Sequence, residues 1–262
     1  MGTAAVQGEL WGAKASDWAK IQEPSWRPVF KFVLTTANVG PGTRLLDVGC
    51  GSGGLLALAH ARGAAPAGLD ASEALVTVAR ERLPTARIEV GDMENLPFAD
   101  GEFDVVTGIN AFQFADDTEA ALSEAGRVCR RDGTVLMLVW GERQKCELLA
   151  ATGSAIGPLL PTTAGPTTQP FANPGFIEDL MRRSGLRATD AGELDALLTF
   201  PNLETAVRAV SSSGIATRAE RHSGAEEVAG AITVALRPFA RADGSVRLAN
   251  QFRWVTATPE RG

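Results

Sequence analysis

In the first half of the chain, short apolar segments of strand length alternate with segments whose apolar residues have helical spacing. Five runs bounded by turn residues have the length of strands: residues 45–48, 67–69, 87–90, 103–109 and 134–140. Between them, apolar residues recur every three or four positions, as on the buried face of a helix, in residues 54–62, 72–83 and 118–129. Strands that alternate with helices predict an α/β protein with a mainly parallel sheet.

The second half of the chain predicts further elements around a loop. Residues 152–175 are rich in glycine, proline and threonine and predict a mobile flap over the substrate. Asn173 and Pro174 predict the start of a helix that ends at Gly185. A strand is expected to follow as far as Phe200.

A helical insert is expected between this strand and the last one. Asn202 predicts the start of one helix, which Gly214 closes. Ser223 and Glu226 have the spacing of a capping box for another helix. Residues 246–254 alternate apolar and polar side chains and predict an outer strand, while the Asp132–Gly133 pair predicts a turn before the fifth strand.

The N-terminal segment is aromatic and has a helical pattern. Trp11, Trp18 and Gln22 are spaced by seven and four residues, which places them near one face of a helix over residues 9–24. Residues 26–34 form a second amphipathic stretch. The tryptophans of this segment either anchor the helices to the sheet or line a pocket.

The junction after the first strand predicts a cradle for a small molecule. Gly49, Gly51 and Gly53 lie between a strand and a helix, where glycine permits unusual backbone conformations and the close approach of a ligand. The spacing also fits a dinucleotide site with Gly54 as its last glycine. Asp47, two residues before the first glycine, disfavours a diphosphate and favours a ligand that is cationic on that side.

Four stretches together resemble the class I S-adenosylmethionine (SAM)-dependent methyltransferases. They are Leu46–Gly53 (LDVGCGSG), Gly68–Ser72 (GLDAS), Gly91–Phe98 (GDMENLPF), and Phe103–Val106 (FDVV) leading to Asn110. The resemblance implies an α/β fold with a Rossmann-like, doubly wound, seven-stranded sheet whose last strand is antiparallel. It also implies N-terminal helices and a helical cap inserted before the last strand.

The expected layout is a single methyltransferase domain over residues 1–262. Its parts are N-terminal lid helices (1–40), a SAM-binding core (41–141), a lid helix and loop (142–175), and a C-terminal half (176–262) with the cap insert at 201–242.

Ten residues are expected to bind SAM: Asp47, Gly49, Cys50, Gly51, Gly53, Asp70, Ala71, Asp92, Met93 and Asn110. Asp70 ends a strand about 20 residues past the glycines, where an α/β fold places a carboxylate that accepts ribose hydroxyls. Asp70 has an alternative role as the N-cap of the next helix, with Glu73 as its capping-box partner. The resemblance implies that Asp92 accepts from the adenine amino group and that Met93 packs at the ring; the alternative for Asp92 is an exposed loop acid.

The residues expected to line the acceptor pocket are aromatic: Trp11, Trp18, Phe112, Phe114 and Trp140. Phe112 and Phe114 also have an interpretation as core residues. No catalytic base stands out. His222 lies between predicted cap helices and is the remaining candidate, with an exposed loop histidine as the alternative, and His60 is expected to be structural.

Charge and cysteine content exclude several classes of protein. The net charge of −6 disfavours a nucleic-acid surface, which needs clustered lysine and arginine. Three cysteines without a paired spacing indicate neither a disulfide framework nor a zinc site, so no metal is expected. The beginning of the chain lacks a signal-peptide pattern, and no apolar run is long enough to cross a membrane, so a cytoplasmic protein, monomeric or homodimeric, is expected.

The function implied by the resemblance is methyl transfer from SAM, with S-adenosylhomocysteine (SAH) as product, to a small or medium-sized organic acceptor. O-methylation of a specialised metabolite is the first expectation. Because the methyl donor is already activated, catalysis can rest on alignment and exclusion of water. The alternatives are C- or N-methylation of a metabolite or peptide, an NAD(P)-dependent oxidoreductase, and a SAM-binding protein without catalysis.

Overall fold

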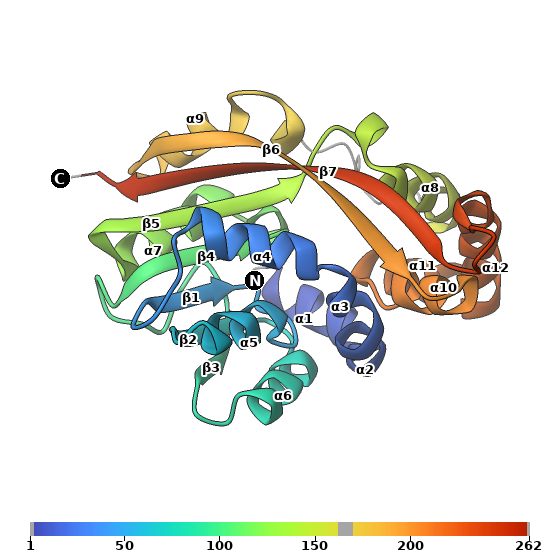
Figure 1. Ribbon diagram of the computed structural model, residues 1–262, viewed down its shortest axis with the longest axis horizontal. Helices are drawn as coiled ribbons and strands as arrows, with labels where there is room; N and C mark the ends of the chain where they lie inside the picture. Colours follow the sequence, from blue (N-terminus) through green and yellow to red (C-terminus); the bar gives the residue numbers. More distant parts are fainter. Residues whose placement is uncertain (1–2, 162–169, 261–262) are drawn as a thin grey trace.

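A seven-stranded sheet forms the centre of the computed structural model, which describes residues 3–161 and 170–260 (Figure 1). The strand order is β3-β2-β1-β4-β5-β7-β6. The strands are β1 (Arg44–Val48), β2 (Ala65–Asp70), β3 (Arg87–Val90), β4 (Phe103–Ile109), β5 (Cys129–Trp140), β6 (Leu186–Phe200) and β7 (Val246–Pro259). The first five are parallel, and β7 runs antiparallel to both of its neighbours, which confirms the predicted fold class.

Helices cover both faces of this sheet. On one face lie α4 (Arg27–Thr36), α5 (Gly54–Ala61) and α6 (Glu73–Arg82), whose apolar side chains pack with those of β1, β4 and β5. On the other face, α7 (Thr118–Val128) and α9 (Phe176–Arg183) cover a second apolar layer. Since both faces are buried, the central strands are almost continuously apolar.

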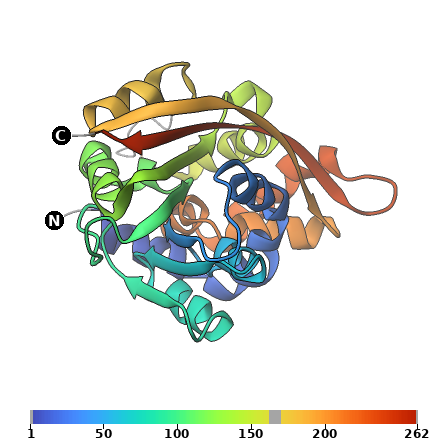
Figure 2. The ribbon, with the colours of Figure 1, turned by 60° about the vertical axis from the view of Figure 1, so that its left-hand side comes forward.

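A third core lies beyond the sheet, where the β6–β7 hairpin extends past the other strands (Figures 1 and 2). Four helices surround this extension: α8 (Glu147–Ile156), α10 (Leu203–Ser211), α11 (Gly214–Ser223) and α12 (Ala225–Leu236). Three of them come from the predicted insert between the last two strands. They form a cap with its own apolar interior around Leu198, Phe200, Val246 and Leu248.

The N-terminal segment contains several short helices where the spacing predicts one. It consists of α1 (Ala4–Gly12), α2 (Ala15–Asp17), a π-helical turn (Trp18–Gln22) and α3 (Glu23–Ser25). The prediction of a continuous helix over 9–24 was therefore wrong at Ala13–Lys14. Trp11 and Trp18 nevertheless come together, with ring centroids 5.1 Å apart.

Several predicted boundaries in the C-terminal half were also wrong. Residues 152–156 continue α8, and residues 162–169 of the predicted flap lie outside the described part of the chain. The helix predicted at Asn173–Pro174 begins at Phe176, after Gly175 in a left-handed conformation (φ 82°). Gly214 opens α11, because Ser213 caps that helix by accepting from the amide of Ala216.

Three further local predictions need correction. The helix α12 follows Gly224, and Ser223 donates to the carbonyl of Leu159, so no capping box forms. Strand β5 begins at Cys129, so Asp132–Gly133 lies in a strand with an irregular register and not in a turn. Strand β7 lies between β5 and β6, so β6 is the outer strand.

Candidate active site

The glycine-rich loop joins the carboxyl end of β1 to α5. Gly49, Gly51 and Gly53 have φ angles of 73°, 56° and 81°, a left-handed region that residues with a Cβ adopt at a cost. At Gly49 there is also no space, since a Cβ would lie 2.5 Å from the Cβ of Ala111. The loop is therefore pressed against the turn that follows β4.

We expect Gly49→Ala to destabilise the fold by about 2–3 kcal/mol, because it combines a left-handed backbone with a steric collision. Urea denaturation followed by circular dichroism measures this loss. The double variant Gly49→Ala/Ala111→Gly removes the collision and should regain part of the stability. Equal stability of the single and double variants would show that the contact with Ala111 is unimportant.

Asp70 lies at the carboxyl end of β2 and holds the glycine-rich loop. Its Oδ2 accepts from the amide of Gly51 at 2.9 Å, and its Oδ1 accepts from the amide of Ser72 at 2.8 Å. Burial raises the pKa of this carboxyl group, while the amides of Ser72 and Gly51 oppose the rise. Ser72, not Asp70, is the N-cap of α6, because its Oγ accepts from the amide of Leu75, so the capping alternative was wrong.

Asp47 lies on β1, two residues before the same loop, and is almost completely buried, with 4% of its surface exposed. Its Oδ1 accepts a hydrogen bond from the hydroxyl of Thr107 on β4 at 2.7 Å. Burial raises the pKa of Asp47 to about 7, and the Thr107 hydrogen bond opposes this rise. A cationic group next to Asp47 would favour the ionised carboxylate.

Asn110 turns the chain at the carboxyl end of β4 in a left-handed conformation (φ 48°). Its Oδ1 accepts from the amide of Trp140 at 3.0 Å and from Nε2 of Gln113 at 3.2 Å. The Nδ2 of Asn110 and the Oε1 of Gln113 are buried and have no hydrogen-bond partner among the described residues. A free donor and a free acceptor therefore lie on one short segment beside the glycine-rich loop.

The remaining residues expected to bind the cofactor differ in their burial and in their contacts. Asp92 is half-buried and accepts from the amide of Glu94 at 3.0 Å, which shapes the loop after β3. Met93 is partly buried against the core. Cys50 is buried against Gly68 of β2, and burial raises its pKa, so its thiol is a packing group. The carbonyl of Ala71 lies against Gly8, so α1 covers the loop after β2.

Four of the five aromatic residues expected at the acceptor pocket belong to two clusters of packed rings, and the fifth, Phe112, belongs to the core. Trp11 packs against Trp18, and its ring lies 5.6 Å from that of Phe114. Trp140 packs against Trp26 and Phe252 at the end of β5, with centroid distances of 5.2 and 4.7 Å. Phe112 is fully buried with its ring against Gly108, so it has the core role and offers no surface to a ligand.

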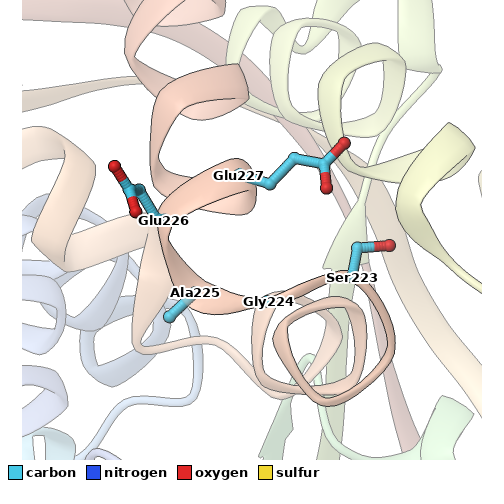
Figure 3. A pocket seen from close by; sticks show the side chains of 5 residues that line it. All are labelled: Ser223, Gly224, Ala225, Glu226 and Glu227. Carbon is cyan, nitrogen blue, oxygen red and sulfur yellow. The ribbon is translucent and has the colours of Figure 1, made fainter.

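His222 is exposed on the last turn of α11. It lines a shallow depression of about 390 Å³ together with Val6, Leu10, Pro161, Arg218 and Arg221. A neighbouring hollow of about 480 Å³ lies at the α11–α12 junction, where the side chains of Glu226 and Glu227 point apart (Figure 3). Neither depression is lined by the glycine-rich loop, so neither contains the residues expected to bind the cofactor.

One residue of this region was missed in the sequence. Glu23 in α3 accepts from both the amide and the hydroxyl of Ser52 in the glycine-rich loop. No local pattern reveals this contact, since the two residues are 29 positions apart. Glu23 is also one of several charged residues in the N-terminal segment, together with Glu9, Lys14, Asp17 and Lys20, so its charge alone does not single it out.

The groups present fit a nucleoside that carries a cationic amino acid. Each Asp70 oxygen accepts one amide hydrogen bond and retains a lone pair for a hydroxyl group. The glycine-rich loop admits close approach, Asp47 precedes it on β1, and Asn110, whose buried Nδ2 has no partner among the described residues, follows the neighbouring strand β4. Within residues 3–161 and 170–260, no three His, Cys, Asp or Glu side chains are grouped as metal ligands, and no helix is long and apolar enough to cross a membrane.

Known proteins are similar to this chain in sequence and in fold. The family described as "Methyltransferase domain" matches residues 46–137. An uncharacterized protein of Mycobacterium tuberculosis is 33% identical over 141 residues, 52% of this chain and 51% of that protein, so the chain spans about half of this relative's length. Nocamycin O-methyltransferase of Saccharothrix syringae is 30% identical over 217 residues, 72% of this chain and 75% of the relative. The YcgJ protein of Bacillus subtilis has the same fold, with a TM-score of 0.58 and 19% identity over 89% of this chain and 98% of that one.

Proposed function

Because this chain belongs to the class I SAM-dependent methyltransferases, we propose that it methylates an oxygen atom of a small or medium-sized organic acceptor, such as a specialised metabolite. The observation that carries the cofactor assignment is the Asp70 carboxylate bound to the Gly51 amide. Support for oxygen as the methylated atom comes from the relative that is named an O-methyltransferase.

Residues at the carboxyl ends of β1 to β4 would hold SAM. Asp70 would accept the ribose hydroxyls, Asp92 and Met93 would contact the adenine, and Asp47, Gly49 and Asn110 would receive the amino-acid end. When bound, SAM supplies a methyl group activated by its positively charged sulfur. The carboxylate of Asp47 favours the cationic end of this ligand over a diphosphate, which is the argument against a nicotinamide cofactor.

The chain's own contribution to transfer is orientation and exclusion of water. The ring of Trp11 packs against those of Trp18 and of Phe114, which follows β4, and these three rings would form an apolar cover for the acceptor. The free Oε1 of Gln113 would accept a hydrogen bond from the hydroxyl of the acceptor and hold its oxygen in line. Orientation in a water-poor site supplies a large part of the rate when the methyl group is already activated.

We expect SAH to form when purified protein and SAM meet a hydroxyl-bearing apolar acceptor, because the free acceptor atom of Gln113 favours a hydrogen-bond donor. A panel of matched phenols, anilines and their methyl ethers, assayed by mass spectrometry for SAH and methylated product, measures this. Methylation of the anilines alone would contradict O-methylation and favour N-methylation, and methylation at carbon would favour C-methylation. SAH binding with no product from any class would favour the non-catalytic alternative.

We expect His222→Ala to leave turnover unchanged, because the imidazole is exposed and lies apart from the glycine-rich loop. The rate of SAH formation with the best acceptor of the panel checks this. A fall of a hundredfold or more, with SAH affinity unchanged, would make His222 the general base.

The setting of the protein is proposed from its thiols and charge. Cys50, Cys129 and Cys146 are all free and buried, which suits the reducing cytoplasm. The net charge of −6 suits a small-molecule acceptor better than a nucleic acid. We propose a monomer or homodimer that acts there without a metal.

A further inference from the structure

We propose that Glu23 is a positioning residue that fixes the glycine-rich loop in its SAM-binding shape and ties the N-terminal segment over it. This inference rests on the proposed function, because it concerns the same cofactor site. Glu23 lies in α3, outside the stretch that matches the methyltransferase family.

Both carboxylate oxygens of Glu23 accept hydrogen bonds from residues that are distant in the sequence. Its Oε1 accepts from the amide of Ser52 at 3.1 Å, and its Oε2 accepts from the Ser52 hydroxyl at 2.6 Å. The same Oε2 accepts from Nη1 of Arg82, the last residue of α6, at 2.6 Å. Glu23 is 4% exposed, so these three bonds replace nearly all of its hydration.

Two carboxylates thus hold consecutive amides of the loop. Asp70 accepts from the amide of Gly51, and Glu23 accepts from the amide of Ser52. Gly51 and Gly53, which flank Ser52, both have left-handed φ angles. The Glu23 carboxyl carbon would lie 2.7 Å from a Cβ on Gly54, so the charge is placed directly at the N-terminus of α5. An anion there is favoured by the helix dipole.

The same residue anchors the aromatic cover. The π-helical turn that precedes Glu23 carries Trp18, whose indole nitrogen would lie 3.2 Å from a Cβ on Gly51. Trp18 in turn packs against Trp11, and α1 lies along Ala71 and Ser72 through Gly8 and Gly12. Loss of Glu23 therefore releases both the loop and its cover.

The far end of the N-terminal segment is held differently. Three ion pairs join it to the cap: Glu9 with Arg221, Asp17 with Arg208, and the partly buried pair of Lys14 with Glu220. An exposed pair such as Glu9–Arg221 contributes little because water and salt screen it. Glu9→Gln is thus a matched control, since it removes an N-terminal carboxylate that does not contact the glycine-rich loop.

The experiment compares Glu23→Ala, Glu23→Gln and Glu9→Gln with the unsubstituted protein. Calorimetric titration with SAH is done at a temperature where far-UV circular dichroism shows each variant to be folded, and trypsin cleavage after Lys20 is timed without ligand. We expect Glu23→Ala to weaken SAH binding about ten- to a hundredfold and to speed cleavage, because Ser52 loses both bonds. Glu9→Gln should change the affinity less than twofold.

A conservative exchange separates positioning from general stability. Glu23→Gln keeps an acceptor for the Ser52 amide but points an NH2 group at Arg82, so its affinity should fall between the two extremes. Adding Arg82→Met removes this conflict between donors and should restore SAH binding and slow cleavage again.

Folded Glu23→Ala and Glu23→Gln variants that bind SAH within twofold of the unsubstituted protein, and are cleaved no faster, would overturn the proposal. Failure of the unsubstituted protein to bind SAH would instead contradict the proposed function. The cleavage rates would in that case still decide whether Glu23 holds the N-terminal segment.

Discussion

Replacing Asp70 with alanine should weaken SAH and SAM binding at least a hundredfold while the chain remains folded. The substitution removes the expected acceptor for the ribose hydroxyls and leaves the Gly51 amide without its partner. Two charge-assisted hydrogen bonds to a ligand, lost together, account for such a change. The fold should persist because the substitution also removes the cost of burying a carboxylate, which is the cost that raises the Asp70 pKa.

Calorimetry with SAH measures this effect, and Asp132→Ala is its control. Asp132 is an exposed acid at the opposite end of the sheet, at the start of β5, and its loss should leave the affinity unchanged. Asp70→Asn retains one carbonyl oxygen and should bind SAH with intermediate affinity. SAH affinity that is equal in the unsubstituted protein and in Asp70→Ala would remove Asp70 from the cofactor site.

Replacing Asp47 with asparagine should stabilise the ligand-free protein at pH 8 and leave its stability unchanged below pH 4. The Asp47 pKa is about 7 in the fold against 3.8 ordinarily, so between these values the folded state holds a proton that the unfolded chain has lost. Stability from this group therefore falls as the pH rises from 4 to 7 and is constant above. The shift corresponds to on the order of 4 kcal/mol.

Urea denaturation of both proteins across this pH range measures the difference. Asp104→Asn is a control of opposite sign, because hydrogen bonding by Arg44 lowers the Asp104 pKa to about 2. Asp104 stabilises the fold above its ordinary pKa and loses this contribution as the pH falls toward 2, so Asp104→Asn should destabilise the protein at pH 8. Greater stability of the unsubstituted protein than of Asp47→Asn at pH 8 would contradict the burial argument.

The same Asp47→Asn variant should bind SAM more weakly at pH 8, since a neutral amide no longer favours the cationic end of the ligand. Stability and affinity would then move in opposite directions. Such a trade is common where a buried charge serves a ligand and not the fold.

The central sheet and the glycine-rich loop were predictable because local chemistry dictates them. Strands buried on both faces are mostly apolar, and the left-handed conformations at Gly49, Gly51 and Gly53 favour glycine. The position of Asp70 followed from the rule that ligands meet an α/β sheet at the carboxyl ends of its strands. These features need no knowledge of contacts between distant residues.

The errors arise where a local pattern has two solutions. A glycine can either end or begin a helix. Gly214 begins α11 because the side chain of Ser213 caps the N-terminus of that helix. An alternating strand is an edge or an inner strand, and the pairing of β7 with both β5 and β6 makes it inner. An aromatic residue after a strand lines a pocket or fills the core, and for Phe112 the space above Gly108 decides for the core.

Other features depend wholly on tertiary contacts. The spacing of Trp11, Trp18 and Gln22 suits one helix, yet the chain breaks so that Trp18 can lie over the loop. Glu23 gains its role only from Ser52 and Arg82, which are 29 and 59 positions away along the chain. A single sequence contains no periodic signal for such a contact.

The most direct test of the central claim is calorimetric titration of the ligand-stripped protein with SAM, SAH and NAD in parallel. The arrangement of Asp47, Asp70 and the glycine-rich loop predicts that SAM and SAH bind and that NAD does not. Binding of NAD without SAM or SAH would contradict the cofactor assignment and make the loop a diphosphate site.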